Sequence, residues 1–200
     1  MPDAIGVYGG TFDPIHFGHL NLAVQLMEFH GLQEVWFCPA KISPHKTHKK
    51  TVEITHRLEM VSLAISSVPQ FKLLDYEANL EGLSYTVQTL RFLHEREQIS
   101  PEPRQLHLLL GDDSLAAFLS WKEPAEIVRL APPLIACRQW SQTWEENDSI
   151  SKAIRLGMTP TNIMEISSTD IRSRLAKGLY CGHLVPEKVL DYINKHQLYL

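Results

Sequence analysis

Apolar runs of strand length alternate along this chain with amphipathic stretches of helical length. The first apolar run is Ile5–Tyr8, an amphipathic stretch covers Gly18–His30, and a second apolar run follows at Glu34–Pro39. Short apolar runs suit buried strands, whereas apolar positions that recur every three or four residues suit helices. The beginning of the chain therefore predicts a β-α-β unit.

The same alternation continues through the rest of the chain. It predicts further strands at Phe71–Leu74, Leu106–Leu110, Leu134–Cys137 and Ile163–Ile166, and helices at Ile54–Ser66, Tyr85–Glu97 and Val185–Lys195. We expect Ser84 to cap the second of these helices, and Pro186 to stand in the first turn of the last one. Two polar stretches, Pro39–Val52 and Ser141–Ser149, are predicted to be loops.

Alternating strands and helices indicate an α/β fold. Parallel neighbours need a crossover connection, so we expect a mostly parallel sheet with helices on both faces and ligands at the carboxyl ends of the strands. No second core is evident in the sequence. We therefore predict a single domain over residues 1–200, with the helices of residues 167–200 packed on it.

Composition narrows the possible functions. The chain has 200 residues, of which 44% are hydrophobic and 21% charged, and a formal net charge of −4. This charge disfavours broad nucleic-acid binding, which needs a basic surface. Three widely spaced cysteines indicate neither a disulfide framework nor a thiolate zinc site. With no signal peptide or membrane span in the sequence, we expect a cytoplasmic protein without a membrane partner.

The most informative segment follows the first predicted strand and has the sequence GGTFDPIHFGHL, from Gly9 to Leu20. Gly9 and Gly10 can adopt positive φ and let the backbone approach a ligand, and the amides of the turn and of the next helix would face an anion. His16 and His19 are three residues apart and share one helix face. The pattern predicts a phosphate site, in which both imidazoles can donate hydrogen bonds.

Simpler interpretations exist for the same residues. A Gly-Gly pair can be only a turn, and the two histidines can be a surface pair or part of a metal site. Two histidines do not complete a zinc shell, however. The combination of strand, glycine turn and paired histidines at a helix start favours phosphate chemistry.

A second candidate site has the sequence ISSTDIR, from Ile166 to Arg172. Ser167 or Ser168 can cap a helix here, and Arg172 falls four residues beyond Ser168, on the same face. Its guanidinium suits phosphate oxygens. Taken alone, the segment is equally well a helix cap with a surface arginine.

Together the two segments resemble the signatures of the nucleotidyltransferase superfamily. GGTFDPIHFGHL is similar to its G-x-F-D-P-x-H-x-G-H element, and ISSTDIR to its I-S-S-T-x-I-R element. Further similarity to bacterial nicotinate-mononucleotide adenylyltransferases lies in SYTVQTL from Ser84, in GDDSL from Gly111 with Trp121 beyond, and in Pro44-His45-Lys46. The resemblance spans nearly the whole chain and implies a Rossmann-like, doubly wound parallel sheet with a C-terminal helical segment.

The resemblance also implies a role for each matched residue. The catalytic residues would be His16, His19 and Arg172. The other ATP contacts would come from Gly9, Gly10, Thr11, Phe12, Lys46, Ser168 and Thr169. Ribose would be bound by Gly111 and Asp113, and nicotinate mononucleotide by Thr86, Trp121 and Arg138.

The proposed acceptor contacts make physical sense for nicotinate. A helix N-terminus at Thr86 attracts a carboxylate, and the indole of Trp121 can stack on a pyridinium ring. Trp121 can also be a core aromatic, and the basic run Lys46–Lys50 can be solvated charge. Arg138 is followed by Gln139-Trp140, where family members often have Pro-Gly, so the shape of this loop is left open.

The resemblance implies that the enzyme transfers the adenylyl group of ATP to nicotinate mononucleotide, with Mg²⁺ held on the substrate phosphates rather than by the protein. Alternatives are the same chemistry with nicotinamide mononucleotide or phosphopantetheine, cytidylyl transfer to an alcohol phosphate, or a non-catalytic nucleotide-sensing module. SYTVQTL and Trp121 argue against the other acceptors, and His16, His19 and Arg172 argue against a sensor. The sequence leaves open how strongly nicotinate is preferred over nicotinamide, because backbone donors can decide this, and it leaves the oligomeric state open.

Overall fold

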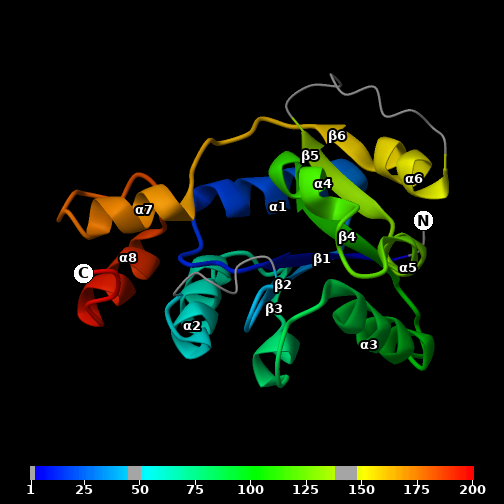
Figure 1. The fold of residues 1–200 in the computed structure, drawn as a ribbon, viewed down its shortest axis with the longest axis horizontal. Helices are drawn as coiled ribbons and strands as arrows, with labels where there is room; N and C mark the ends of the chain where they lie inside the picture. The colour runs from blue at the N-terminus through cyan, green and yellow to red at the C-terminus, as the bar shows by residue number, and fades with distance from the viewer. Residues whose placement is uncertain (1–2, 45–50, 138–147) are drawn as a thin grey trace.

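A computed structural model describes residues 3–44, 51–137 and 148–200 (Figure 1). Its six-stranded sheet has the order β3-β2-β1-β4-β5-β6, and every neighbouring pair is parallel. The strands are β1 Ala4–Gly10, β2 Glu34–Pro39, β3 Phe71–Leu73, β4 Gln105–Gly111, β5 Pro133–Cys137 and β6 Met158–Pro160. This order, which reverses direction between β1 and β4, is that of a Rossmann-like doubly wound fold and confirms the predicted fold class.

Helices cover both faces of the sheet. They are α1 Phe17–His30, α2 Ile54–Ile65, α3 Thr86–Gln98, α4 Asp112–Phe118, α5 Pro124–Leu130, α6 Ser149–Gly157, α7 Ser168–Leu175 and α8 Glu187–Lys195, with a 3₁₀ turn η1 at Tyr76–Asn79. One buried cluster joins the sheet to α1, α2, α7 and α8, and a second joins it to α3, α4, α5 and α6. None of the helices in the described ranges is both long and apolar enough to cross a membrane.

The apolar pattern of the central strands follows from these two layers. Leu108 and Leu110 on β4 belong to the second cluster, whereas Leu109 between them belongs to the first. A strand that is covered on both faces has no solvent side, so the near-continuous apolar run of β4 is the expected pattern. Gly6 on β1 permits this packing, because a Cβ there would meet the side chains of Leu109 and Leu32 at 2.9 and 3.0 Å.

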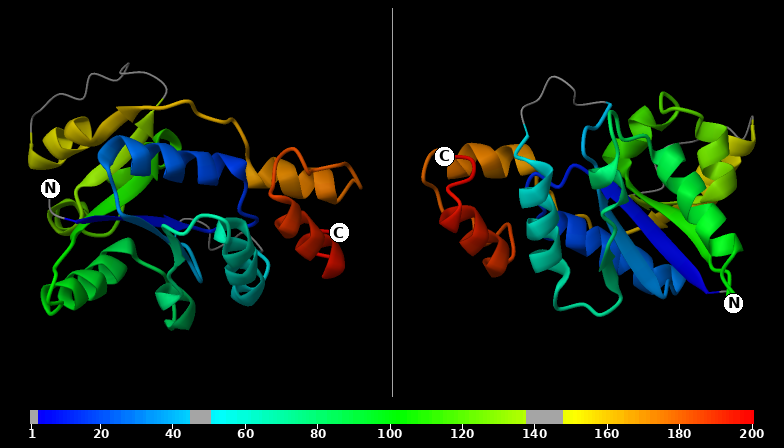
Figure 2. Two further views of the ribbon diagram at one scale, coloured as in Figure 1. Left: turned by 180° about the vertical axis from the view of Figure 1, so that it is seen from behind. Right: turned by 90° about the horizontal axis from the view of Figure 1, so that it is seen from below.

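Helices α7 and α8 lie together at one end of the molecule, beside α2 and the beginning of α1 (Figures 1 and 2). Ile171 and Leu175 of α7, and Val189 and Ile193 of α8, are buried in the same cluster as the core residues of α1 and α2. The second predicted phosphate segment is thereby brought to the N-terminal end of α1.

Two predictions about the elements were wrong. Residues Ile163–Ile166 are not a strand, and β6 lies earlier, at Met158–Pro160. The apolar residues of this segment belong to a connection fastened to α1, where Asn21 Nδ2 and Gln25 Nε2 donate to the carbonyl oxygen of Asn162 at 2.6 and 2.9 Å. Ser84 does not cap α3; its hydroxyl accepts a hydrogen bond from the backbone of Lys41 at 3.0 Å.

Other differences between the predicted and observed elements are smaller. Pro186 is the N-cap of α8 rather than a residue of its first turn. Helices α4, α5 and α6 were not predicted from the sequence. The first two have seven residues each, too few for a 3.6-residue period to stand out.

Candidate active site

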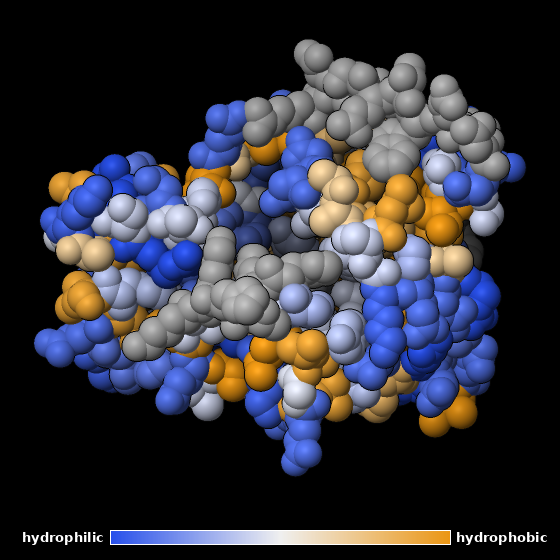
Figure 3. Space-filling view, in the orientation of Figure 1, coloured by the Kyte–Doolittle hydropathy of each residue, from blue (hydrophilic) through white to orange (hydrophobic). Residues whose placement is uncertain are grey.

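A cleft of about 630 Å³ opens at the carboxyl ends of the strands, where the sheet order reverses. In Figure 3 the corresponding face of the molecule is hollowed near its centre, and hydrophilic residues line the recess. Every predicted site residue that the structure describes lines this cleft: Gly9, Gly10, Thr11, Phe12, His16, His19, Thr86, Gly111, Asp113, Trp121, Ser168, Thr169 and Arg172. Segments from both halves of the chain therefore meet at one cavity.

The first side of the cleft is the turn from β1 into α1. Gly9 and Gly10 are the last residues of β1 and do not have positive φ, so this part of the prediction was wrong. The left-handed residue is Phe12, with φ of 49°, whose ring is buried against Tyr8 and Phe37. Gly10 is needed for space, because a Cβ there would lie 2.8 Å from the Phe12 ring.

The two histidines stack on each other at the start of α1. Their ring centroids are 3.6 Å apart, and the planes differ by 25°. The backbone N–H of His16 donates to His19 Nδ1 at 3.2 Å, so a neutral His19 carries its proton on Nε2. In this tautomer, Nε2–H is the hydrogen-bond donor of the His19 ring.

His16 differs from His19 in its burial. It is the N-cap of α1 and only 6% exposed, and burial lowers its pKa from 6.5 to about 4. Its Nδ1 is buried and has no hydrogen-bond partner among the described residues. His16 is therefore neutral at physiological pH, with hydrogen-bonding capacity to spare beside a candidate phosphate site.

The second turn, from the 161–166 connection into α7, closes against the first. Ser167 is the N-cap, and its hydroxyl accepts from the backbone N–H of Thr169. The hydroxyl of Ser168 donates to the carbonyl oxygen of Pro14 at 2.9 Å, which ties the two turns together. Gly18 allows this approach, since a Cβ there would lie 3.2 Å from the Met164 carbonyl oxygen.

Arg172 reaches from α7 to the first turn. Its Nη1 donates to the carbonyl oxygen of Asp13 at 2.6 Å and lies 3.8 Å from Asp13 Oδ2, while Nη2 donates to the hydroxyl of Thr169 at 3.2 Å. The guanidinium is thus oriented by both turns and lines the cleft between them.

Arg57 of α2 supports the same region but was not predicted. Only 1% exposed, it donates from Nη1 to the carbonyl oxygens of Thr11 and Ala40 at 2.8 and 2.6 Å, from Nη2 to that of Lys41, and from Nε to that of Val52. Burial lowers the pKa of Arg57, and the nearby Asp13 opposes this shift. Its partners are backbone atoms, so no side-chain pattern in the sequence marks them.

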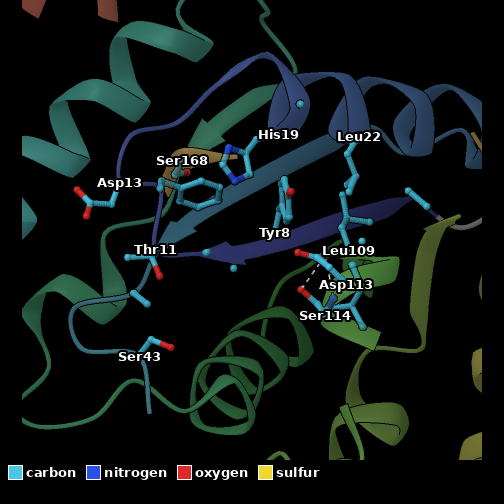
Figure 4. A pocket seen from close by; sticks show the side chains of 18 of the residues that line it. Tyr8, Thr11, Asp13, His19, Leu22, Ser43, Leu109, Asp113, Ser114 and Ser168 are labelled. Carbon is cyan, nitrogen blue, oxygen red and sulfur yellow. Dashed lines mark hydrogen bonds between the residues drawn. The ribbon is translucent and has the colours of Figure 1, made fainter. Parts of the chain in front are cut away.

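Across the cleft, the lining comes from the beginnings of α3 and α4. Figure 4 shows Thr11, His19 and Ser168 on one side of Tyr8, and Asp113 and Ser114 on the other. Asp113 Oδ1 accepts from the backbone N–H of Ser114 at 2.8 Å. Gly111 makes room for it, because a Cβ there would lie 2.8 Å from that oxygen.

Trp121 and Thr86 border the same side. Trp121 is partly exposed and packs on Phe118, with centroids 5.4 Å apart, and Thr86 is the first residue of α3. The ammonium of Lys122 lies 4.6 Å from the centroid of the Tyr85 ring, which links the beginning of α3 to the segment after α4. Tyr85 and Lys122 also line the cleft and were not predicted.

Two predicted site residues, Lys46 and Arg138, lie in the segments 45–50 and 138–147, outside the described residues. Within the described part of the chain, no group of three or more His, Cys, Asp or Glu side chains is placed to hold a metal ion.

Comparison with known proteins agrees with this architecture. The model of the cytidylyltransferase-like family matches residues 7–174. A probable nicotinate-nucleotide adenylyltransferase of Salinibacter ruber is 35% identical to the chain, covering 98% of it and 97% of the relative. Another from Dictyoglomus thermophilum is 38% identical and covers 98% and 99%. The chain belongs to the nicotinate-nucleotide adenylyltransferase family.

Solved structures with the same fold include a nicotinic acid mononucleotide adenylyltransferase of Plasmodium falciparum in complex with NaAD. It is 23% identical, with a TM-score of 0.77, and the match covers 98% of this chain and 97% of that one. A second structure of the Plasmodium protein, in complex with APC, has a TM-score of 0.75. The nicotinate-nucleotide adenylyltransferase fold thus extends over essentially the whole chain.

Proposed function

We propose that this chain transfers the adenylyl group of ATP to nicotinate mononucleotide, forming nicotinate adenine dinucleotide and pyrophosphate. The observation that carries the proposal is the meeting of two helix N-terminal turns, with His16, His19 and Arg172, at one cleft. Helix N-termini, imidazoles and a guanidinium all favour polyphosphate. Family membership supports the same activity.

In the proposed reaction, the 5′-phosphate of the acceptor attacks the α-phosphorus of ATP in line, and the bond to pyrophosphate breaks. The nucleophile is already anionic, so the protein supplies no general base. Negative charge grows on the oxygen that bridges the α and β phosphates, and His19 Nε2–H and Arg172 are proposed to stabilise it there. Donors fixed before the reaction stabilise the transition state without reorganisation.

Mg²⁺ is proposed to arrive on the substrate phosphates. This fits the described residues of the cleft, where the carboxylate of Asp13 is bonded to Tyr199 and that of Asp113 to the backbone of Ser114. Mg²⁺ retains waters and uses few protein ligands, and on the phosphates it would neutralise part of the charge of the leaving pyrophosphate.

For the acceptor, we propose that Thr86 and Trp121 bind the nicotinate group. Gly111 and Asp113 are proposed to contact a substrate ribose. Thr86 begins a helix, which favours a carboxylate, and the half-exposed indole of Trp121 offers a face for the ring. A cytoplasmic location, one domain over residues 1–200, and the absence of nucleic-acid and membrane partners stay predictions from the sequence.

The test incubates the purified protein with ATP, Mg²⁺ and one acceptor at a time, and follows both pyrophosphate and the dinucleotide product. The acceptors are nicotinate mononucleotide, nicotinamide mononucleotide and phosphopantetheine. We expect the highest kcat/KM with nicotinate mononucleotide. A higher kcat/KM with another acceptor would contradict nicotinate mononucleotide as the substrate. A lack of product with all three acceptors would contradict the proposed activity.

A further inference from the structure

Tyr199 is bonded to the phosphate-binding turns although it does not line the cleft. Its hydroxyl donates to Asp13 Oδ1 at 2.7 Å, across 186 positions of the sequence. Among the described residues, the cleft lining includes Asp13 but not Tyr199. Any effect of Tyr199 on bound phosphates therefore passes through Asp13.

Asp13 is the point at which several elements meet. It is 3% exposed, and its carbonyl oxygen accepts from Arg172 Nη1, which also lies 3.8 Å from Oδ2. The hydroxyl of Tyr199 donates to the other carboxylate oxygen, Oδ1. In Figure 4, the Asp13 carboxylate points away from His19 and Tyr8. The two bonds thus fix both the carboxylate and the guanidinium beside it.

The backbone around Tyr199 is shaped to present its hydroxyl. Gln197 and Tyr199 have φ of 51° and 66°, a region that residues other than glycine rarely adopt. Between them, Leu198 is 8% exposed and belongs to the same core cluster as α7 and α8, and its backbone N–H donates to the Ile193 carbonyl oxygen. Such strained conformations persist only where the surrounding structure holds them.

The charge balance explains why Asp13 needs a hydrogen-bond donor. A carboxylate that turned into the cleft would repel a polyphosphate and compete with it for Arg172. Burial of an ionised carboxylate is tolerated when hydrogen bonds and nearby positive charge compensate for it. A phenol supplies such a bond without placing another charge beside Arg172. Burial, together with the charge of Asp13, raises the pKa of Tyr199, so this phenol keeps its proton.

We propose that Tyr199 is a positioning residue for the triphosphate site: its hydroxyl holds the Asp13 carboxylate turned away from the cleft, and so keeps Arg172 available to the phosphates. This inference rests on the proposed function, in that it assumes ATP is the ligand. It assigns no contact with substrate to Tyr199. The effect is confined to the side of the cleft that binds ATP.

The test compares Tyr199→Phe with Tyr192→Phe. The control removes a hydroxyl on α8, which bonds to His56 of α2 at 2.9 Å, away from the cleft. We expect Tyr199→Phe to raise both the Kd for a non-hydrolysable ATP analogue and the KM for ATP by about tenfold, since bonds to charged groups are the stronger ones. The KM for the acceptor should not change, and Tyr192→Phe should leave both constants at the wild-type values.

Equal changes in the two KM values, or the same rise in Tyr192→Phe, would indicate general structural damage and overturn the proposal. So would a Kd within about twofold of wild type, because the bond to Asp13 would then not be coupled to phosphate binding. Binding of the analogue is measured without an acceptor. Lack of turnover with nicotinate mononucleotide would therefore contradict the proposed function and leave this comparison intact.

A double-mutant cycle tests the route through Asp13. Asp13→Asn removes the negative charge and keeps a similar shape, so adding Tyr199→Phe to it should weaken binding of the analogue far less than it does in the wild type. Additive losses would contradict the proposal. Asp13→Asn and Tyr199→Phe are both compared at temperatures well below their measured melting points, so that unfolding does not enter the binding constants.

Discussion

The cleft has two sides that are built differently. The α1–α7 side, residues 9–19 and 167–172, is fixed by bonds between distant segments, and Phe12, Asp13 and His16 on it are almost fully buried. The α3–α4 side, residues 84–86 and 111–122, places Thr86 and Trp121 half-buried and Asp113 exposed. On the first side, hydrogen bonds already fix the groups that would bind a charged ligand. On the second side, side chains can be substituted at little cost in stability.

This difference corresponds to the two substrates of the proposed reaction. Every adenylyl transfer handles the same triphosphate, so rigid donors are useful on the α1–α7 side. Acceptors differ from one adenylyl transfer to another. On the α3–α4 side, the residues that line the cleft lie at the ends of helices, where one side chain can be substituted without the others. Substitutions on the first side should therefore affect rate and stability, and substitutions of Thr86 or Trp121 on the second should affect the acceptor alone.

The largest effect is expected for His19→Ala, on the α1–α7 side. Removing one preorganised donor from a site of developing charge lowers turnover by roughly 10²- to 10³-fold. His19 is only partly buried, so the fold should remain intact. The measurements are kcat with saturating substrates and the circular dichroism spectrum. A variant with near-normal kcat would contradict the role proposed for His19.

Next is Arg57→Met, which tests how firmly the α1–α7 side is held. The change keeps an apolar stem but leaves the carbonyl oxygens of Thr11 and Ala40 without this donor, and removes a positive charge near Asp13. We expect the free energy of unfolding to fall by about 3 kcal/mol, as measured by denaturant titration. Arg129→Met is the control, because Arg129 is exposed and pairs only with Glu126 among the described residues. An equal loss in both variants would contradict a special role for Arg57.

Arg57 and Tyr199 also show where prediction from the sequence stops. The glycines, histidines and Arg172 could be found because their chemistry is concentrated in two short motifs. Arg57 bonds to backbone carbonyls and Tyr199 to a carboxylate 186 positions away, so nothing beside either residue marks its role. Their partners are defined only once α2 has packed on the sheet and α8 has packed on α2.

The fold shows the same limit. Strands β1 to β5 and the parallel sheet could be predicted from apolar runs that alternate with amphipathic stretches. The apolar segment Ile163–Ile166, in contrast, has the local pattern of a strand but does not form one. Its conformation depends on two side chains of α1, because Asn21 and Gln25 donate hydrogen bonds to the carbonyl oxygen of Asn162. A tertiary contact of this kind leaves no trace in local periodicity.

A third prediction concerns pH and again the α1–α7 side. Since burial lowers the pKa of His16 from 6.5 to about 4, the folded protein binds fewer protons than the unfolded chain between these values. The free energy of unfolding should therefore fall as the pH is lowered through this window, with about 2 kcal/mol of the loss at pH 5 due to His16. His30 and His107, whose pKa values burial also lowers, add to the loss in the same direction.

His16→Asn isolates the contribution of this one residue. The variant should lose about 2 kcal/mol less than the wild type between about pH 7.5 and pH 5, because it retains His30 and His107 but not the buried His16. Denaturant titrations at both pH values measure the difference. Parallel curves for wild type and variant would mean that His16 titrates normally in the folded protein.

The smallest effect is expected on the α3–α4 side, for Trp121→Ala. A stacked indole contributes on the order of 1 kcal/mol to binding of a pyridinium ring, so the KM for nicotinate mononucleotide should rise by about fivefold. The KM for ATP should stay the same, since the hydrogen bonds described for Asp13 and Arg172 are made with Tyr199, Thr169 and each other. Leu119→Ala is the matched control, because Leu119 is two residues away and 54% exposed but does not line the cleft. Equal rises in the KM for both substrates would mean that the two sides of the cleft are not independent, and the contrast between them would then fail.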